Sequence, residues 1–187
     1  MTVRPHHRRG STAPRAVDPL RPCARGGRRR EACPVRRPGS EALPERVVEQ
    51  LCPVAQAAGV DLTIERGDEP VPVHGDAQQI ERAVTNVVSN AVKFTPAGGT
   101  VAVTTDRHGD VVRITCRDSG MGIPEAERQR LFTRFFRASD AQAGQIQGTG
   151  LGLVIVRTIA EVHGGTVDLE SVEGEGTTVT ITLPIAP

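Results

Sequence analysis

The sequence predicts an α+β fold, in which antiparallel strands form one layer and helices group on one of its faces. In several segments hydrophobic residues recur every three to four positions, which is the period of an amphipathic helix. In shorter segments they alternate with polar residues, as in strands that have one buried face. Helical segments and strand pairs follow one another along the chain, an order that a two-layer α/β sandwich explains.

The two ends of the chain differ in charge. The formal net charge is +1 over 187 residues, but residues 1–40 hold 11 arginines against two acids, whereas residues 41–187 carry a balance of −8. The first segment is rich in Arg, Pro and Gly and has no hydrophobic period, so we expect a disordered basic tail ahead of a folded domain over 41–187. A basic tail can attract nucleic acid, but this one lacks interleaved aromatic residues, and we expect no nucleic-acid partner.

The composition also excludes several classes of protein. No hydrophobic run approaches the roughly 20 residues of a membrane-spanning helix, and none follows the basic N-terminus as in a secretory signal. The cysteines lack the paired spacing of a zinc site or a disulfide framework, so we expect neither, and a cytoplasmic location is the simplest interpretation. They are Cys23, Cys33, Cys52 and Cys116.

The first part of the folded domain is predicted to contain one helix and two strands. Residues 40–58 have a hydrophobic stripe at helical spacing, and Gly59 ends it. Pro53 lies inside this helix and is expected to kink or end it. Alternating residues predict short strands over 61–65 and 71–75.

A long helix over 77–94 carries the first candidate site, and Asp76 precedes it as a candidate cap. Opposite the hydrophobic face of this helix, Asn86, Asn90 and Lys93 follow one another at helical spacing. Two amides and an ammonium group on one face can hold a hydrated Mg²⁺ and the phosphates that it bridges, because Mg²⁺ takes few protein oxygens and keeps several waters. An ordinary solvated helix face is the alternative.

The second candidate site is the segment DSGMGI (118–123), which follows a predicted hairpin of strands over 100–106 and 111–118. An aspartate at the end of a strand, followed by glycines, can point its carboxylate into a cleft while the backbone approaches a flat ligand. That carboxylate, Asp118, would accept a hydrogen bond from an exocyclic amine and so select adenine over guanine. A tight strand-to-helix turn is the alternative.

The third candidate site is GTGLGL (148–153), which follows a polar loop and opens a helix over 151–165. Its glycines, Gly148, Gly150 and Gly152, allow backbone N–H groups to approach phosphate oxygens at a helix N-terminus. The segment is not a P-loop, because no lysine follows, and it does not follow a strand as a dinucleotide fingerprint does. The remaining predicted elements are a helix over 124–132 and a final hairpin of strands over 166–172 and 177–185.

In this order and on these elements, the three segments closely resemble the ATP-binding catalytic domain of sensor histidine kinases, within the larger family shared with gyrase, mismatch-repair and chaperone ATPases. The resemblance covers about residues 41–187. The matching segments are NVVSNAVKFT (86–95) for the N box, DSGMGI and GTGLGL for the two glycine boxes, LFTRFFR (131–137) for the F box and GEGTTVTITLP (174–184) for the closing strands. The resemblance implies a Bergerat-type fold, a mixed, mostly antiparallel sheet covered on one face by about three helices.

The resemblance also implies a role for each matched residue. Asn90 would ligate Mg²⁺ with Asn86 supporting it, while Lys93 and Arg137 would face the phosphates. Asp118 would bind the adenine amine. The other residues that would contact the nucleotide are Phe94, Gly120, Gly122, Ile123, Phe132, Gly148, Thr149, Gly150, Leu151, Gly152, Leu153 and Thr178.

The aromatic residues of the F box are Phe132, Phe135 and Phe136. By the same resemblance they would hold a mobile lid over residues 138–149 apart from the sheet. Core packing is the alternative for at least one of them.

The function that the resemblance implies is binding of ATP and Mg²⁺ and donation of the γ-phosphate to a histidine, in a two-component system with a response regulator downstream. No histidine of this sequence is followed by Glu or Asp, the usual context of the acceptor, so we expect the acceptor on a partner chain. Asn86 stands where ATP-hydrolysing relatives carry Glu, which argues against efficient ATP hydrolysis. A non-catalytic ATP-binding module and an anti-sigma-type serine kinase are the alternatives.

Overall fold

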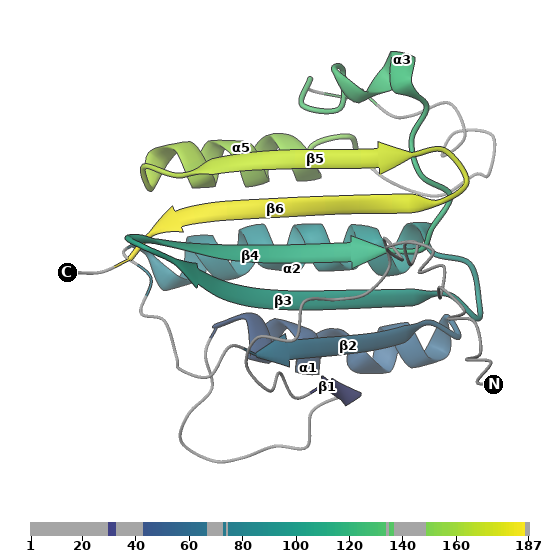
Figure 1. Ribbon diagram of the computed structural model, residues 1–187. Helices are drawn as coiled ribbons and strands as arrows, with labels where there is room; N and C mark the ends of the chain where they lie inside the picture. Colours follow the sequence, from purple (N-terminus) through teal and green to yellow (C-terminus); the bar gives the residue numbers. More distant parts are fainter. Residues whose placement is uncertain are drawn as a thin grey trace, which may run out of the picture.

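Six strands form a single sheet with helices on one of its faces (Figure 1). The computed structural model describes residues 30–32, 43–66, 73, 75–133, 135–136 and 149–185. In this part of the chain the strand order is β1-β2-β3-β4-β6-β5, and β2 pairs with β3 in parallel while the other neighbours are antiparallel. The strands are β1 (Arg30–Ala32), β2 (Asp61–Arg66), β3 (Thr100–His108), β4 (Val111–Asp118), β5 (Thr166–Val172) and β6 (Gly176–Pro184). The predicted mixed, mostly antiparallel sheet is confirmed.

The helices α1, α2 and α5 lie behind the sheet in Figure 1, and the short α3 lies at one end of the molecule. Their bounds are α1 (Leu43–Ala57), α2 (Ala77–Phe94), α3 (Glu125–Arg128) and α5 (Gly152–Val162). α2 contacts both α1 and α5, so it is the central helix of the layer.

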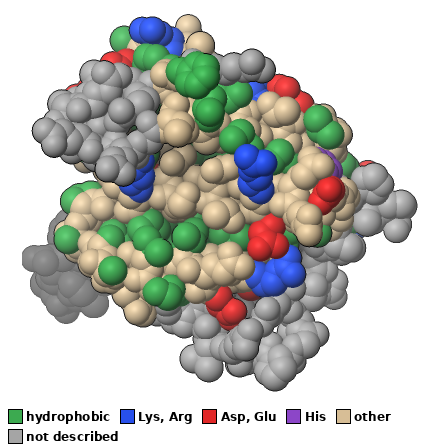
Figure 2. All heavy atoms as spheres, turned by 180° about the vertical axis from the view of Figure 1, so that it is seen from behind, with side chains coloured by type: hydrophobic (Ala, Val, Ile, Leu, Met, Phe, Trp, Pro, Cys, Tyr) green, Lys and Arg blue, Asp and Glu red, His purple; other side chains and the backbone are tan. Residues whose placement is uncertain are grey.

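The core between the two layers is aliphatic. α2 buries a stripe that includes Ile80, Val84 and Val88, each at most 1% exposed, and this is the helical period that its sequence predicts. On the strands every second residue faces the same core, such as Val112 and Ile114 on β4. Figure 2 shows the helix-covered side of the molecule, where groups of hydrophobic side chains are separated by individual charged ones.

Ile64, on β2, is 1% exposed and is one of the larger fully buried side chains. Its replacement by alanine is expected to lower the free energy of unfolding by about 2–5 kcal/mol, because the lost methyl groups leave a cavity. Urea unfolding measures this change. Val54, on the outer side of α1, is 55% exposed, and the control variant Val54→Ala is expected to change stability by less than about 0.5 kcal/mol. Equal losses in the two variants would contradict the packing described here.

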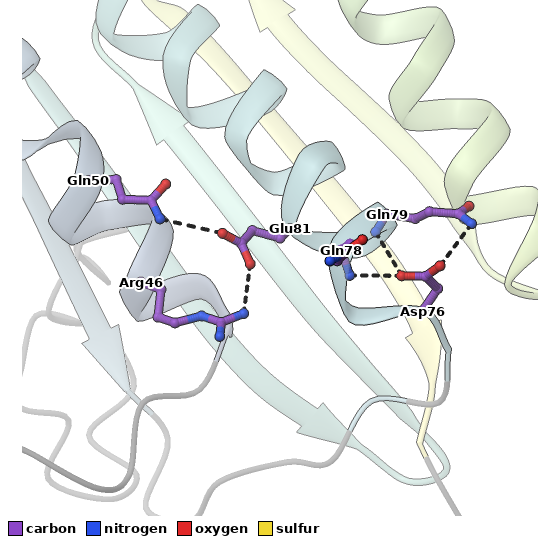
Figure 3. Close-up of polar contacts among 6 residues, drawn as sticks. All are labelled: Arg46, Gln50, Asp76, Gln78, Gln79 and Glu81. Atoms are coloured by element: carbon purple, nitrogen blue, oxygen red, sulfur yellow. Dashed lines mark hydrogen bonds and ion pairs between the residues drawn. The ribbon is translucent and has the colours of Figure 1, made fainter.

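Polar contacts fix the start of α2 (Figure 3). The Oδ1 atom of Asp76 accepts hydrogen bonds from the backbone N–H groups of Gln78 (2.8 Å) and Gln79 (3.2 Å), as the predicted cap requires. These bonds, that of Gln79 first, hold the pKa of Asp76 below its ordinary value. One turn further along, Glu81 accepts from Arg46 of α1 at 2.6 Å, which joins the two helices.

Of the two outcomes expected at Pro53, a kink or an end, the end does not occur, because α1 continues to Ala57. Pro53 is exposed, so the backbone position without an N–H group lies on the solvent side of the helix. The helix expected over 124–132 is shorter, because after α3 the N–H groups of Arg130 and Leu131 bond three residues back, in tight turns rather than α-helix.

Two further predictions differ from the structure, and a third is only partly covered by it. Residues 30–32 were expected in the tail, but they form β1 and pair with the edge of β2, while the rest of residues 1–40 lies outside the described part. Of the strand expected over 71–75, residues 71, 72 and 74 lie outside the described part, and Val73 forms an isolated bridge with Ile185. Cys52 is disulfide-bonded, which its spacing in the sequence did not indicate, and its partner lies outside the described residues.

Candidate functional site

A cavity of about 480 Å³ lies among α2, the start of α5 and the adjoining ends of β4 and β6. It brings together the three candidate segments, which are far apart in the sequence. From the N box it is lined by Asn86, Asn90, Lys93 and Phe94. From the two glycine boxes it is lined by Asp118, Gly122, Ile123, Thr149, Gly150, Leu151, Gly152 and Leu153. The convergence favours a binding site over a set of unrelated turns.

The α2 side of the cavity follows from helical periodicity. The buried stripe of α2 faces the sheet, so the residues that flank it at i and i+4 share the neighbouring face. Asn86 and Asn90 are partly buried on this face, whereas Lys93 is exposed. The Lys93 Nζ atom lies 5.1 Å from the ring centre of Phe94, at the C-terminal end of the helix. Two amides and a cation therefore line one wall.

Asp118 ends β4 with its carboxylate at the cavity. Its Oδ1 atom accepts two backbone hydrogen bonds, from Gly120 at 2.9 Å and from Thr177 at 3.1 Å. Both bonds use the same oxygen, so Oδ2 is left to accept a hydrogen bond from a ligand. Burial raises the pKa of Asp118, and the two hydrogen bonds partly oppose that increase. A partly desolvated acceptor of fixed orientation is suited to recognising an amine.

The segment after Asp118 is held between two other elements. The Met121 N–H group donates to the carbonyl oxygen of Phe94 at 3.2 Å, and the Gly174 N–H group donates to the carbonyl oxygen of Met121 at 2.8 Å. Gly122 has a φ of 66°, and a Cβ atom there would overlap the carbonyl oxygen of Val172. Glycine is therefore required at this position by both conformation and space.

The start of α5 faces the two amides of α2. A Cβ atom on Gly152 would lie 3.3 Å from Asn90 Nδ2 and 3.8 Å from Asn86 Oδ1, so the absence of a side chain keeps this space open. The N-cap residue, Leu151, makes no side-chain cap hydrogen bond. The first N–H groups of an α-helix have no partner within the helix, and the helix dipole favours negative charge there.

The F-box residues do not act as one group. Phe132 does not line the cavity and instead lies beneath the Arg157 guanidinium, 5.2 Å from ring centre to Cζ. Phe136 lines the cavity, whereas the contact with the nucleotide was predicted for Phe132. Phe135 is 73% exposed and has a φ of 63°. The lid over 138–149 that these residues were predicted to hold falls outside the described part, except for Thr149.

Two more residues predicted to contact the nucleotide are not among those that line the cavity. Thr178 does not line it, and Thr177 does. Neighbouring residues of β6 point to opposite faces of the sheet, and Thr177 is the residue paired with Asp118. Gly120 is not a lining residue either, but its N–H group fixes the Asp118 carboxylate. Arg137 and Gly148 lie outside the described residues.

Some lining residues were missed in the sequence. Most are hydrophobic and form walls that suit a flat ring, and alternation along β4, β5 and β6 marks several of them as inward-facing. They include Val87, Ala91, Cys116, Met121, Leu131, Ile155, Leu169 and Val179. The missed charged residue is Arg82, one turn before Asn86 on α2. Its spacing of four residues was a usable signal.

Two properties of the described residues bear on other classes of site. None of the helices there is long and hydrophobic enough to cross a membrane. No group of three or more His, Cys, Asp or Glu side chains there could hold a metal ion. The amides of Asn86 and Asn90 line the cavity and carry oxygen atoms of the kind that Mg²⁺ accepts.

Comparison with known proteins was made by sequence and by structure. Residues 75–187 match the family of histidine kinase-, DNA gyrase B- and HSP90-like ATPases. The chain is 37% identical over 119 residues to the sensor histidine kinase WalK of Bacillus subtilis, and 41% identical over 134 residues to the histidine protein kinase DivJ of Caulobacter vibrioides. These matches cover 63% and 70% of this chain but only 20% and 22% of the two relatives.

Solved structures give the same result. The catalytic domain of histidine kinase ThkA has a TM-score of 0.67 at 29% identity, over 78% of this chain and 93% of that chain. Full-length ShkA in complex with AMPPNP has a TM-score of 0.65 at 30% identity, over 77% of this chain and 29% of that chain. The chain therefore belongs to the family of histidine kinase-, DNA gyrase B- and HSP90-like ATPases, and its fold is that of a histidine kinase ATP-binding catalytic domain.

Proposed function

We propose that this chain binds ATP with Mg²⁺ and donates the γ-phosphate to a histidine on an acceptor domain of a partner chain, with a response regulator downstream in a two-component system. The observation that carries the proposal is the convergence, in one cavity, of Asp118, the amides of Asn86 and Asn90, and the start of α5. A structural neighbour, ShkA, was solved in complex with the ATP analogue AMPPNP. Because ATP is a cytoplasmic nucleotide, the proposal places this domain in the cytoplasm.

In this proposal the adenine ring lies at the Asp118 end of the cavity. The free Oδ2 atom of Asp118 accepts a hydrogen bond from the exocyclic amine, while Oδ1 remains bound to the backbone. Met121 and Leu169 are among the hydrophobic lining residues that can cover a flat ring. The ring is thus selected by one polar contact within apolar walls.

The phosphates lie between α2 and the start of α5. Asn90 would ligate Mg²⁺ through its amide oxygen, Asn86 would support it one turn earlier, and Lys93 would add positive charge. Mg²⁺ usually keeps several waters and takes few protein oxygens, so one amide ligand from the protein would be enough. Bound Mg²⁺ supplies charge neutralisation during phosphoryl transfer. The uncapped N–H groups of α5 hold the phosphates from the other side.

The cavity favours transfer to a partner over transfer to water. The position one turn before Asn90 holds the amide of Asn86, which cannot accept a proton as a general base would. Among the described lining residues Asp118 is the carboxylate, and it lies at the opposite end from the phosphates. The imidazole of a histidine on another chain is itself the nucleophile, because its neutral ring nitrogen carries a lone pair, so it does not need a base in this cavity.

A transfer assay tests this function. The chain is incubated with γ-labelled ATP, Mg²⁺ and a separate histidine-containing acceptor hairpin from a sensor kinase. Label on the acceptor that is labile to acid and stable to alkali, and that is absent from an acceptor whose histidine is replaced, is the expected result. Arg113 is exposed on β4, and the variant Arg113→Gln should transfer phosphate at the wild-type rate.

Three results would contradict the proposal. Nucleotide binding with no transfer to any acceptor tried would indicate a non-catalytic ATP-binding module. Label that is stable to acid would indicate a serine or threonine acceptor. Rapid ATP hydrolysis without a partner would indicate an ATPase.

A further inference from the structure

Arg82 lines the cavity, although none of the motifs that define the site includes it. It lies on α2 one turn before Asn86 and two turns before Asn90, so the three side chains follow one another along the same face. Arg82 is exposed, and it makes no hydrogen bond or ion pair within the described part of the chain. The adjacent acid, Glu81, is bound to Arg46 at 2.6 Å and faces the other way, toward α1.

Its position along the cavity can be estimated from the helix rise. Phe94 marks the end of α2 next to Asp118, because its carbonyl oxygen accepts from Met121. At about 1.5 Å per residue, Asn90 lies roughly 6 Å from Phe94 along the axis, and Asn86 and Arg82 follow at similar intervals. Arg82 is therefore at the end of the cavity opposite Asp118. Arg82 and Lys93 are the described cations that line the cavity.

We propose that Arg82 binds the terminal phosphate of ATP and so makes the site prefer ATP to ADP. This inference rests on the proposed function, which places adenine at Asp118 and Mg²⁺ at Asn90. A nucleotide bound in that direction extends its last phosphate toward the start of α2, where Arg82 lies. A guanidinium group binds phosphate oxygens through two parallel N–H bonds, and its charge is never lost near neutral pH. ADP does not reach this far.

The test compares two nucleotides in variants at Arg82. Dissociation constants for AMPPNP and ADP, each with Mg²⁺, are measured by calorimetry for the wild type, Arg82→Gln and Arg82→Lys. Arg82→Gln is expected to weaken AMPPNP about 10-fold and ADP less than about 2-fold, because one charge-assisted contact is lost at an exposed site. Arg82→Lys keeps the charge, so its affinity for AMPPNP is expected to lie between those of the wild type and Arg82→Gln. Arg113→Gln removes the same charge on the far face of the sheet and should change neither constant.

The possible results separate this inference from the proposed function. If the wild type binds neither nucleotide, the proposed function fails and this inference fails with it. If the wild type binds both and transfers phosphate, but Arg82→Gln weakens AMPPNP and ADP equally or weakens neither, only the inference about Arg82 is wrong. Slower transfer to the acceptor with unchanged AMPPNP affinity would also overturn it, and would place Arg82 at the partner instead. Thermal unfolding of each variant confirms that the fold is retained.

Discussion

Replacement of Asp118 by asparagine is expected to weaken ATP binding by about 100-fold and to leave the fold intact. The two backbone hydrogen bonds from Gly120 and Thr177 both go to Oδ1, and an asparagine carbonyl oxygen can accept them equally well. The change falls on the other atom, where an N–H₂ group replaces Oδ2. This group would face the adenine amine, so that two donors meet and neither is satisfied.

The loss of affinity in Asp118→Asn should depend on which nucleobase the nucleotide carries. Inosine triphosphate presents a carbonyl oxygen where ATP presents its amine, so Asp118→Asn is expected to shift the preference of the site from ATP toward inosine triphosphate. Calorimetric titration with both nucleotides measures the shift. Asp168→Asn makes the same chemical change at an exposed position on β5 and serves as the control. Equal loss of both nucleotides would show that Asp118 does not read the base.

The raised pKa of Asp118 gives a second readout of the same variant. Burial is the largest cause, so the folded protein holds this proton more tightly than the unfolded chain does. Ionised Asp118 therefore lowers stability, which on this account rises as the pH falls through the folded pKa. At neutral pH, Asp118→Asn should unfold at a temperature no lower than that of the wild type. Wild-type ATP affinity should fall as Asp118 becomes protonated, while the affinity of the variant should be flat over the same range.

The sequence predicted the parts of the site that are fixed by local geometry. Helical period places Asn86, Asn90 and Lys93 on one face of α2, whatever the helix packs against. Asp118 could be placed because a strand end followed by glycines has few possible conformations. These residues line the same cavity in the structure.

The positions that the sequence did not predict depend on contacts between distant segments. Whether Thr177 or Thr178 faces the cavity is decided by the pairing of β6 with β4, and two adjacent threonines carry no hydrophobic signal to fix it. The strand β1 exists through pairing with the edge of β2, not through a pattern of its own. Phe136 rather than Phe132 lines the cavity, and the ring of Phe132 contacts Arg157, which is on α5 and far away in the sequence. A single sequence contains none of these pairings explicitly.

Replacement of Asn90 by alanine is expected to lower the rate of phosphate transfer by about 100- to 1,000-fold, as the loss of one preorganised electrostatic contact does in other enzymes. Asn90 faces the start of α5, where a Cβ atom on Gly152 would come within 3.3 Å of its Nδ2 atom. The alanine side chain has no oxygen to ligate Mg²⁺, so the phosphates lose the ion that orients them. Adenine binding through Asp118 should persist. ADP without Mg²⁺ should therefore bind the variant with nearly wild-type affinity.

The loss cannot be attributed to the helix, because alanine has a higher helix propensity than asparagine and α2 should be at least as stable. Ser89→Ala is the matched control, since Ser89 is the preceding residue of α2 and its hydroxyl donates to the Asn86 carbonyl oxygen outside the cavity. It should transfer phosphate at the wild-type rate.

Titration with Mg²⁺ separates two interpretations of a slow Asn90→Ala variant, which are loss of a metal ligand and loss of packing against α5. If Asn90 ligates the ion, Asn90→Ala requires more Mg²⁺ than the wild type to reach its own maximal rate. An unchanged Mg²⁺ requirement would instead assign the metal to another part of the cavity, and Asn90 would then act only by packing against α5.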